Sequence, residues 1–214
     1  MKFRRKQDTP EQTPEQTGEA TDPTGPAAGE AAAASGPYDV DDLTDDGVER
    51  VDLGSVLVPP IDNRELRMQV DEQSGAVRAV MLAGADGAME FQAFAAPRNG
   101  DLWDEVRPQI AADITRRGGT AAEREGRFGT ELVCQVQVQL PDGKTGTQPS
   151  RIIGVNGPRW MLRASLLGRP ALAPEESQEW EDALAQIVVR RGSEAMPVGE
   201  PLPVRLPDQA RRAD

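Results

Sequence analysis

The chain has 214 residues and a formal net charge of −12, with one cysteine and no histidine. This length allows one domain of ordinary size. The lack of histidine excludes the usual serine and cysteine triads and most zinc sites, and a single cysteine can form neither an intrachain disulfide nor a thiolate metal cluster. We therefore expect no metal and no cofactor.

The negative charge is unevenly distributed. Residues 1–60 hold 13 acidic and 5 basic side chains, and residues 61–214 hold 23 acidic and 19 basic ones, so the first part carries −8 and the second −4. Apart from short pairs and the extreme N-terminus, lysine and arginine form no run that would release counterions from phosphates. Nucleic acid is therefore not an expected partner.

Neither a membrane span nor a secretion signal is predicted. No stretch approaches the ~20 apolar residues that cross a bilayer. The N-terminal "MKFRRKQDTPEQTPEQ" passes from basic to polar residues without the apolar core of a signal peptide. Because the lone Cys134 also suits a reducing compartment, these features predict a cytoplasmic protein without a membrane partner.

Four segments of different composition follow one another. Residues 1–36 are rich in Pro, Glu and Ala, a composition that cannot offset chain entropy, so this leader is predicted to be disordered. Residues 37–60 are predicted to be an acidic strap or linker whose valines and leucines allow it to dock. Residues 61–207 are predicted to form a single domain, and residues 208–214 a frayed tail.

The domain is predicted to begin with three strands and a helix. Strands are indicated at 65–70, 76–83 and 89–95, with turns between them. A helix follows the N-cap residue Asp101, and Pro108 should kink it or delay its start. The apolar stripe of this helix comprises Trp103, Val106, Ile110 and Ile114.

Three more strands and a second helix complete the predicted order. In "ELVCQVQVQL", residues 131–140, apolar side chains share one face and glutamines share the other. A hairpin is indicated around Asn156-Gly157, followed by a helix from Pro174 to Gly192. Because short turns join the strands, we expect an α+β fold: an antiparallel sheet of about six strands in βββα-βββα order, with the helices packed on one face.

Three arginines are the candidate binding residues. The alternation in "RWMLRASLL" places Trp160 in the core and puts Arg159 and Arg163 near the face of the sheet that bears the glutamines. Arg127, beside Phe128, is placed to approach them. Such a cluster can receive a carboxylate or phosphate from a partner. The alternative is that these arginines cover a solvated sheet or pair with local Asp and Glu.

Other candidate sites have simpler interpretations. Residues 42–47, "DLTDDG", fit the first positions of a calcium loop, but Leu53 stands where position twelve needs glutamate, so an acidic solvated linker is predicted. Cys134 falls on the apolar side of its strand, which predicts a packed and unreactive thiol. The glycine-rich "GGTAAEREGRFG" and "GVNGP" lack the setting of a phosphate loop and are interpreted as turns.

Several segments, in chain order, carry a family resemblance: "RVDLGSVLVPP", "FQAFAAPRNGDLWDEVR", "GRFGTEL", "GVNGPRWMLR" and the later "VVRRG". They resemble an actinobacterial domain family of unknown function whose genes often lie beside those for dUTPase, over roughly residues 36–207. This resemblance implies no activity and no catalytic residues. The hairpin followed by a C-terminal helix is also similar to the Mog1/PsbP-like α+β folds, which implies a binding or assembly module.

These observations favour a non-enzymatic module that binds a protein partner through a sheet face or hairpin edge. The alternative is a nucleotide- or phosphate-binding regulator or enzyme linked to nucleotide metabolism. In that case Arg127, Arg159 and Arg163 hold phosphate, and a carboxylate such as Glu131 acts as base. Charge complementarity also motivates the hypothesis that the acidic segment Asp41–Asp46 folds back over the arginines and masks them, which the sequence alone does not decide.

Overall fold

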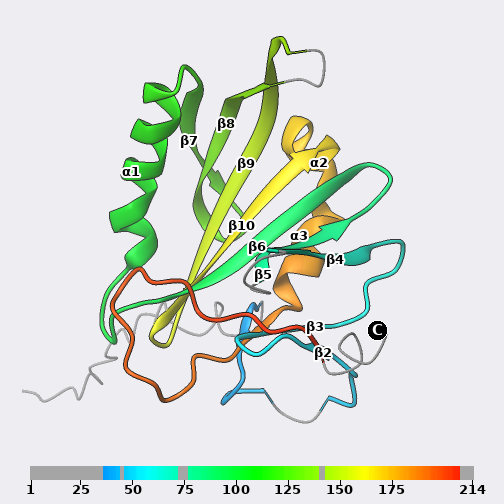
Figure 1. The fold of residues 1–214 in the computed structure, drawn as a ribbon, viewed down its shortest axis with the longest axis vertical. Helices are drawn as coiled ribbons and strands as arrows, with labels where there is room; N and C mark the ends of the chain where they lie inside the picture. The colour runs from blue at the N-terminus through cyan, green and yellow to red at the C-terminus, as the bar shows by residue number, and fades with distance from the viewer. Residues whose placement is uncertain (1–35, 44–45, 72–76, 140–142, 208–214) are drawn as a thin grey trace, which may run out of the picture. The chain divides into compact units, whose positions relative to one another are not determined.

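The computed structural model describes residues 36–43, 46–71, 77–139 and 143–207, and there the chain is a mixed α+β protein built on a seven-stranded antiparallel sheet (Figure 1). The strand order is β4-β5-β6-β10-β9-β8-β7. The strands are β4 (Glu65–Val70), β5 (Val77–Ala83), β6 (Gly87–Ala95), β7 (Thr120–Gly126), β8 (Gly129–Gln139), β9 (Thr145–Gly157) and β10 (Trp160–Gly168). The two halves of the chain meet where β6 pairs with β10, from Gly168 opposite Gly87 to Trp160 opposite Ala95.

The three strands predicted before the first helix are confirmed, but the count of about six is wrong for the large sheet. The additional strand is β7, at residues for which the glycine-rich pattern predicts a turn. β7 is an edge strand that pairs only with β8. Its exposed residues include Glu123, Arg124 and Glu125, because an edge strand needs few apolar side chains and charge protects it from pairing with other chains.

A second, four-stranded sheet has the order β1-β11-β3-β2. It consists of β1 (Tyr38–Asp39), β2 (Val51–Asp52), β3 (Val56–Val58) and β11 (Val188–Val189). β1 runs parallel to β11, and the other pairs are antiparallel. The segment 37–60 thus supplies three of these strands, and its Leu53, Val56 and Val58 are almost fully buried.

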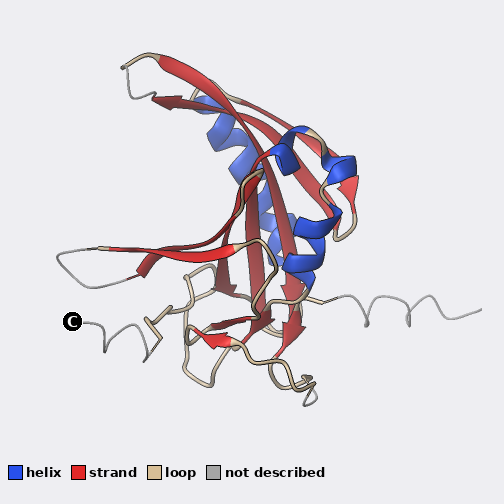
Figure 2. Cartoon of the chain, turned by 90° about the vertical axis from the view of Figure 1, so that its right-hand side faces the viewer, coloured by secondary structure: helices blue, strands red, loops and turns tan. Residues whose placement is uncertain are grey.

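The helices cover opposite faces of the large sheet (Figures 1 and 2). α1 (Leu102–Arg116) packs in one apolar cluster with Met161, and α3 (Gln178–Ala185) packs in another with Trp160 and Leu162. The expectation that both helices share one face is therefore wrong. The reason lies in β10, where successive side chains point to opposite faces and each face has a buried apolar residue, Trp160 on one and Met161 on the other.

The C-terminal helical region is shorter and more divided than the pattern predicts. It consists of α2 (Arg169–Leu172), the 3₁₀ helix η1 (Pro174–Glu176) and α3, and the chain then becomes extended at β11. Trp180 and Leu184 of α3 are buried. Pro108 lies inside α1 and does not delay its start, because the helix begins directly after its N-cap, Asp101.

Candidate functional site

α1 is fixed to the sheet at its N-terminal end. Trp103 packs on Gly154 of β9 so closely that a Cβ at position 154 would lie 2.1 Å from the indole. The indole Nε1 donates a hydrogen bond to the carbonyl oxygen of Thr130 (2.6 Å), and the backbone N of Trp103 donates one to Asn156 Oδ1 (3.2 Å). Asn156 Nδ2 in turn donates to the N-cap carboxylate of Asp101 (2.5 Å). These contacts fix the position of the helix over β9.

A groove lies between α1 and the sheet, with a volume of about 520 Å³. Its apolar lining comprises Phe94, Leu102, Val106, Ile110, Ile114, Val136, Ile152 and Met161. Its polar lining comprises Gln109, Asp113, Arg163 and Ser165. Phe94, Val106 and Ile110 are only partly buried, so the groove presents apolar surface that another molecule can cover. We call this site the α1 groove.

Arg163 supplies the positive charge of the α1 groove. Its guanidinium lies over the ring of Phe94, 5.0 Å from the centroid. Among the described residues it forms no hydrogen bond and no ion pair. Burial lowers the pKa of Arg163 and the charge of Glu90 partly opposes this effect, but an arginine pKa is so high that the side chain stays charged at neutral pH.

The predicted placement of Arg163 beside the glutamines is wrong. The pairs Leu166–Arg151 and Arg151–Val133 show that Leu166 and Val133 lie on the same face, which is the face of α3. Gln135 and Gln137 follow Val133 at steps of two and share that face, whereas Arg163 lies on the α1 face. The register of β8 and β10 on β9 decides which side chains share a face, and alternation within a single strand does not reveal that register.

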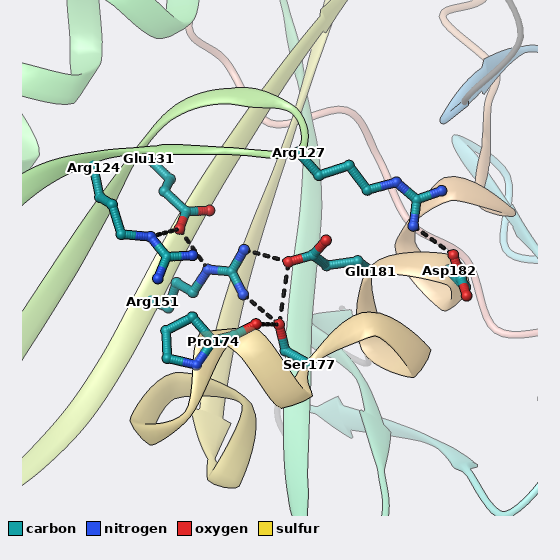
Figure 3. A network of polar contacts seen from close by, with 8 residues as sticks. All are labelled: Arg124, Arg127, Glu131, Arg151, Pro174, Ser177, Glu181 and Asp182. Carbon is teal, nitrogen blue, oxygen red and sulfur yellow. Dashed lines mark hydrogen bonds and ion pairs between the residues drawn. The ribbon is translucent and has the colours of Figure 1, made fainter.

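A buried ionic network lies on the α3 face, centred on Arg151 of β9 (Figure 3). Its Nε donates to Glu131 of β8 (2.7 Å), its Nη2 to Glu181 of α3 (2.5 Å), and its Nη1 to the hydroxyl of Ser177 (2.6 Å). Burial alone would lower the pKa of Arg151, but the hydrogen bonds to the two glutamates raise it overall. The network therefore joins η1 and α3 to the middle of the sheet.

Glu131 is enclosed within this network. Its Oε1 also accepts a hydrogen bond from Arg124 (3.1 Å), while its buried Oε2 has no hydrogen-bond partner among the described residues. Oε2 packs against Gly126, where a Cβ would lie 2.5 Å from it. With an exposed fraction of 1%, the Glu131 carboxylate has no open path to a substrate, so the geometry favours a structural role over that of a base.

The structure places the three predicted binding arginines at three separate sites. Arg127 forms an ion pair with Asp182 of α3 and lies over Phe128, 5.4 Å from the ring centroid. Arg159 occupies the turn between β9 and β10, where its Nη2 donates to the carbonyl of Gly192 (2.8 Å). Arg163 lies in the α1 groove. They do not form one cluster.

Arg159 lines a second cavity, of about 720 Å³, between the β9–β10 turn and the start of the described chain. The basic lining residues are Arg159, Arg190 and Arg191, and the acidic ones are Asp39, Asp41 and Asp42. The acidic segment thus lies in the same cavity as one of the predicted arginines, although no ion pair joins Arg159 to it among the described residues.

Several further expectations concern single residues. Cys134 is buried under α1, and burial raises its pKa to about 11, so the thiol is protonated at neutral pH. Trp160 is in the core, where its Nε1 donates to Asp39 (2.5 Å). In the predicted calcium-like segment, Asp46 instead pairs with Arg50 (2.6 Å). No cluster of three or more potential metal ligands occurs among the described residues, and no helix there is long and apolar enough to cross a membrane.

Arg151, Ser177 and Glu181 are not among the residues that the sequence predicts for a site. Arg151 stands at the edge of the apolar "RIIGV" run, and a charged residue at that position in the sequence gives no sign of complete burial. Its partners Glu131 and Glu181 are 50 residues apart in sequence and 20 and 30 residues from it. Only the packing of η1 and α3 on β9 brings them together.

A family model of proteins of unknown function, DUF3710, matches residues 36–213, and the chain belongs to this family. This confirms the predicted membership of a domain family of unknown function. A comparison with curated proteins finds no match. Among solved structures, a crystal structure of a protein from Bacteroides thetaiotaomicron VPI-5482 is 14% identical with a TM-score of 0.39. The alignment covers 69% of this chain and 50% of that one, and similarity of this size does not establish a shared fold.

Proposed function

We propose that this member of the DUF3710 family is a cytoplasmic, non-enzymatic interaction module that binds a segment of a partner protein in the α1 groove. The proposal rests mainly on one observation: the groove leaves apolar side chains of both the helix and the sheet partly accessible, in a cleft of about 520 Å³. A cleft of this size is within the range that binds several side chains of another molecule.

The energetics favour an apolar segment. Each apolar side chain that is fully buried in such a cleft contributes about 1.5–3 kcal/mol. Because Trp103 and Asn156 hold α1 in place, the groove is preformed and little binding energy is lost in ordering it. Two or three apolar side chains of a partner would therefore give useful affinity.

A selection of random peptides displayed on phage tests this proposal. The full chain is the bait, and Ile110→Gln is the counter-bait, because this change puts a side chain of roughly similar size but polar character in the wall of the groove. Leu172→Gln is the matched control, since Leu172 is apolar, 67% exposed and outside the groove. We expect apolar peptides that bind the wild type and Leu172→Gln but lose at least about tenfold in affinity for Ile110→Gln.

A second candidate function is the binding of a phosphate or nucleotide near Arg159. It is favoured by the guanidinium groups of Arg159 and Arg191, whose described hydrogen bonds go only to backbone carbonyls and not to carboxylates. In this candidate, Asp41 and Asp42 mask the cavity that they share with these arginines.

Thermal unfolding with inorganic phosphate and nucleotides at millimolar concentration tests this second candidate. A bound ligand must raise the melting temperature by mass action. The rise should be lost in Arg159→Gln and enhanced in the double variant Asp41→Asn/Asp42→Asn. An unchanged melting temperature in all of these proteins would remove this candidate.

A further inference from the structure

We propose that the α1 groove recognises a carboxylate on the partner segment, and that Arg163 is the residue that binds it. This inference rests on the proposed function and specifies the chemistry of the partner: an apolar segment that carries an aspartate or glutamate side chain. The argument comes from the environment of Arg163 compared with that of the other arginines.

Arg163 differs from the other arginines in the described part of the chain. Most of those arginines pair with a carboxylate, as Arg151 and Arg107 do, and Arg159 and Arg191 bind backbone carbonyls. Arg98 and Arg205 have no side-chain partner among the described residues, but both are exposed and water can solvate them. Arg163 alone among the described arginines is partly buried and without a hydrogen-bond acceptor.

An arginine in this state favours an anionic ligand. Phe94 and the rest of the groove partly remove the five N–H groups of the guanidinium from water. Phe94 stabilises the cation only through the face of its ring and offers no oxygen or nitrogen as a hydrogen-bond acceptor. Burial also lowers the pKa of Arg163, which reflects the cost of desolvating the cation. A carboxylate would supply two acceptors in the bidentate geometry that guanidinium prefers.

The surroundings favour a carboxylate over a phosphate. Arg163 is the only cation that lines the α1 groove among the described residues. Asp113 lies on the same lining, and its carboxylate already pairs with Arg116 and Arg117. Glu90, which acts on Arg163 through its charge, adds a second negative group nearby. The single positive charge of Arg163 therefore matches the one negative charge of a carboxylate better than the about two negative charges of a phosphate.

The β6–β10 register places neutral hydrogen-bonding groups beside Arg163. Gln92 is its direct cross-strand partner on β6, and Ser165 is the next residue on the same face of β10. Ser165 lines the groove with Arg163. A carboxylate bound to the guanidinium would therefore lie next to an amide and a hydroxyl that can donate further hydrogen bonds.

The test uses the selected peptides, synthesised with amidated C-termini so that side chains supply the only carboxylates. Each acidic peptide is paired with its Glu→Gln or Asp→Asn form, and each is titrated against the wild type, Arg163→Gln and Arg163→Lys by fluorescence anisotropy. Arg205→Gln is the matched control, because it removes one exposed positive charge outside the groove. Thermal unfolding of each variant establishes that it is folded.

We expect the selected peptides to be apolar with an acidic residue at a recurrent position. Arg163→Gln should weaken their binding by about tenfold to a hundredfold, and Arg163→Lys should weaken it less, because a lysine keeps the charge but not the fork of donors. Changing the peptide acid to its amide should cost a similar factor against the wild type and little against Arg163→Gln, which is the signature of a direct pair.

Two outcomes separate this inference from the proposed function. If peptides need an intact Ile110 but bind Arg163→Gln as tightly as the wild type, or contain no acidic residue, the carboxylate inference is wrong and the groove remains a protein-binding site. If no peptide distinguishes the wild type from Ile110→Gln, both the proposed function and this inference fail.

Discussion

Arg151 is the side chain whose loss should harm the fold most. The change Arg151→Met removes the cation between two buried or nearly buried carboxylates, those of Glu131 and Glu181, with side-chain exposed fractions of 1% and 12%. Leaving such carboxylates without their cation typically lowers the free energy of unfolding by about 3–5 kcal/mol. Urea unfolding followed by tryptophan fluorescence measures this loss.

A triple variant separates a missing partner from missing packing. In Arg151→Met/Glu131→Met/Glu181→Met no charge remains buried, and apolar replacements of whole ion-pair networks are often neutral or stabilising. We therefore expect this variant to recover much of the stability lost in Arg151→Met. If the free energy of unfolding of Arg151→Met lies within about 1 kcal/mol of that of the wild type, the network contributes little to stability.

Cys134 should make stability depend on pH in the alkaline range. Burial raises the pKa of its thiol from 9.0 to about 11, so between these values the unfolded chain loses the thiol proton while the folded chain keeps it. The folded state binds more protons there, so stability should be complete below pH 9, fall as pH rises from 9 to 11, and then level off.

The matched comparison for this prediction is Cys134→Ala. Other groups titrate in the same range, but they are common to both proteins, so the difference between their unfolding free energies isolates the thiol. A difference that is constant from pH 8 to 11 would contradict the prediction. Alkylation by iodoacetamide at neutral pH provides a second readout, since the buried protonated thiol should react only after unfolding.

The contact between α1 and β9 depends on the absence of a side chain at position 154. In Gly154→Ala the new Cβ would lie 2.1 Å from the Trp103 indole, so the helix must move away from the sheet. We expect a loss of about 1–3 kcal/mol in unfolding free energy. The hydrogen bond from Trp103 to Thr130 should also weaken, which would change tryptophan fluorescence and lower the affinity of the α1 groove for its peptides.

The control for this prediction is Gly192→Ala. Gly192 has a φ of 70° and open space around it, so alanine there adds backbone strain without a clash. Its effect should be smaller and should leave peptide binding unchanged. Equal effects on peptide binding in the two variants would show that Gly154 does not set the position of α1.

The strands and helices that the sequence predicts are those with a periodic apolar pattern. Alternation identifies β8 and β10, and the N-cap with its apolar stripe identifies α1. β7 is missed because an edge strand can be formed from charged residues. The placement of the two helices is missed because β10 buries an apolar side chain on each face, Trp160 on one and Met161 on the other, and such a strand does not indicate which face each helix covers.

The candidate site is predictable only in part, for a related reason. The sequence identifies Arg163 as a candidate, but the groove around it requires α1 to lie against β7, β8 and β9, a contact that no local pattern encodes. The prediction that the three arginines cluster depends on the assumption that the polar face of β8 and the polar face of β10 lie on the same side of the sheet. In the structure the cross-strand pairs match them differently, and each arginine meets a different part of the molecule.

At the scale of the whole molecule, the segment 37–60 should be required for folding. Its β3 pairs with β11, its β1 pairs with β11 from the other side, and Asp39 accepts the hydrogen bond of the core residue Trp160. Removing the segment would uncover Val188 and Val189, which are fully buried. We therefore expect a protein of residues 61–214 to be strongly destabilised or insoluble.

A protein of residues 35–214 is the matched truncation. The composition of residues 1–34 cannot support a core of its own, so their removal should leave the melting temperature within about 1–2 °C of that of the full chain. Thermal unfolding of the three proteins at equal concentration decides the boundary. If residues 61–214 unfold cooperatively near the temperature of the full chain, the segment 37–60 is a linker and the small sheet does not stabilise the domain.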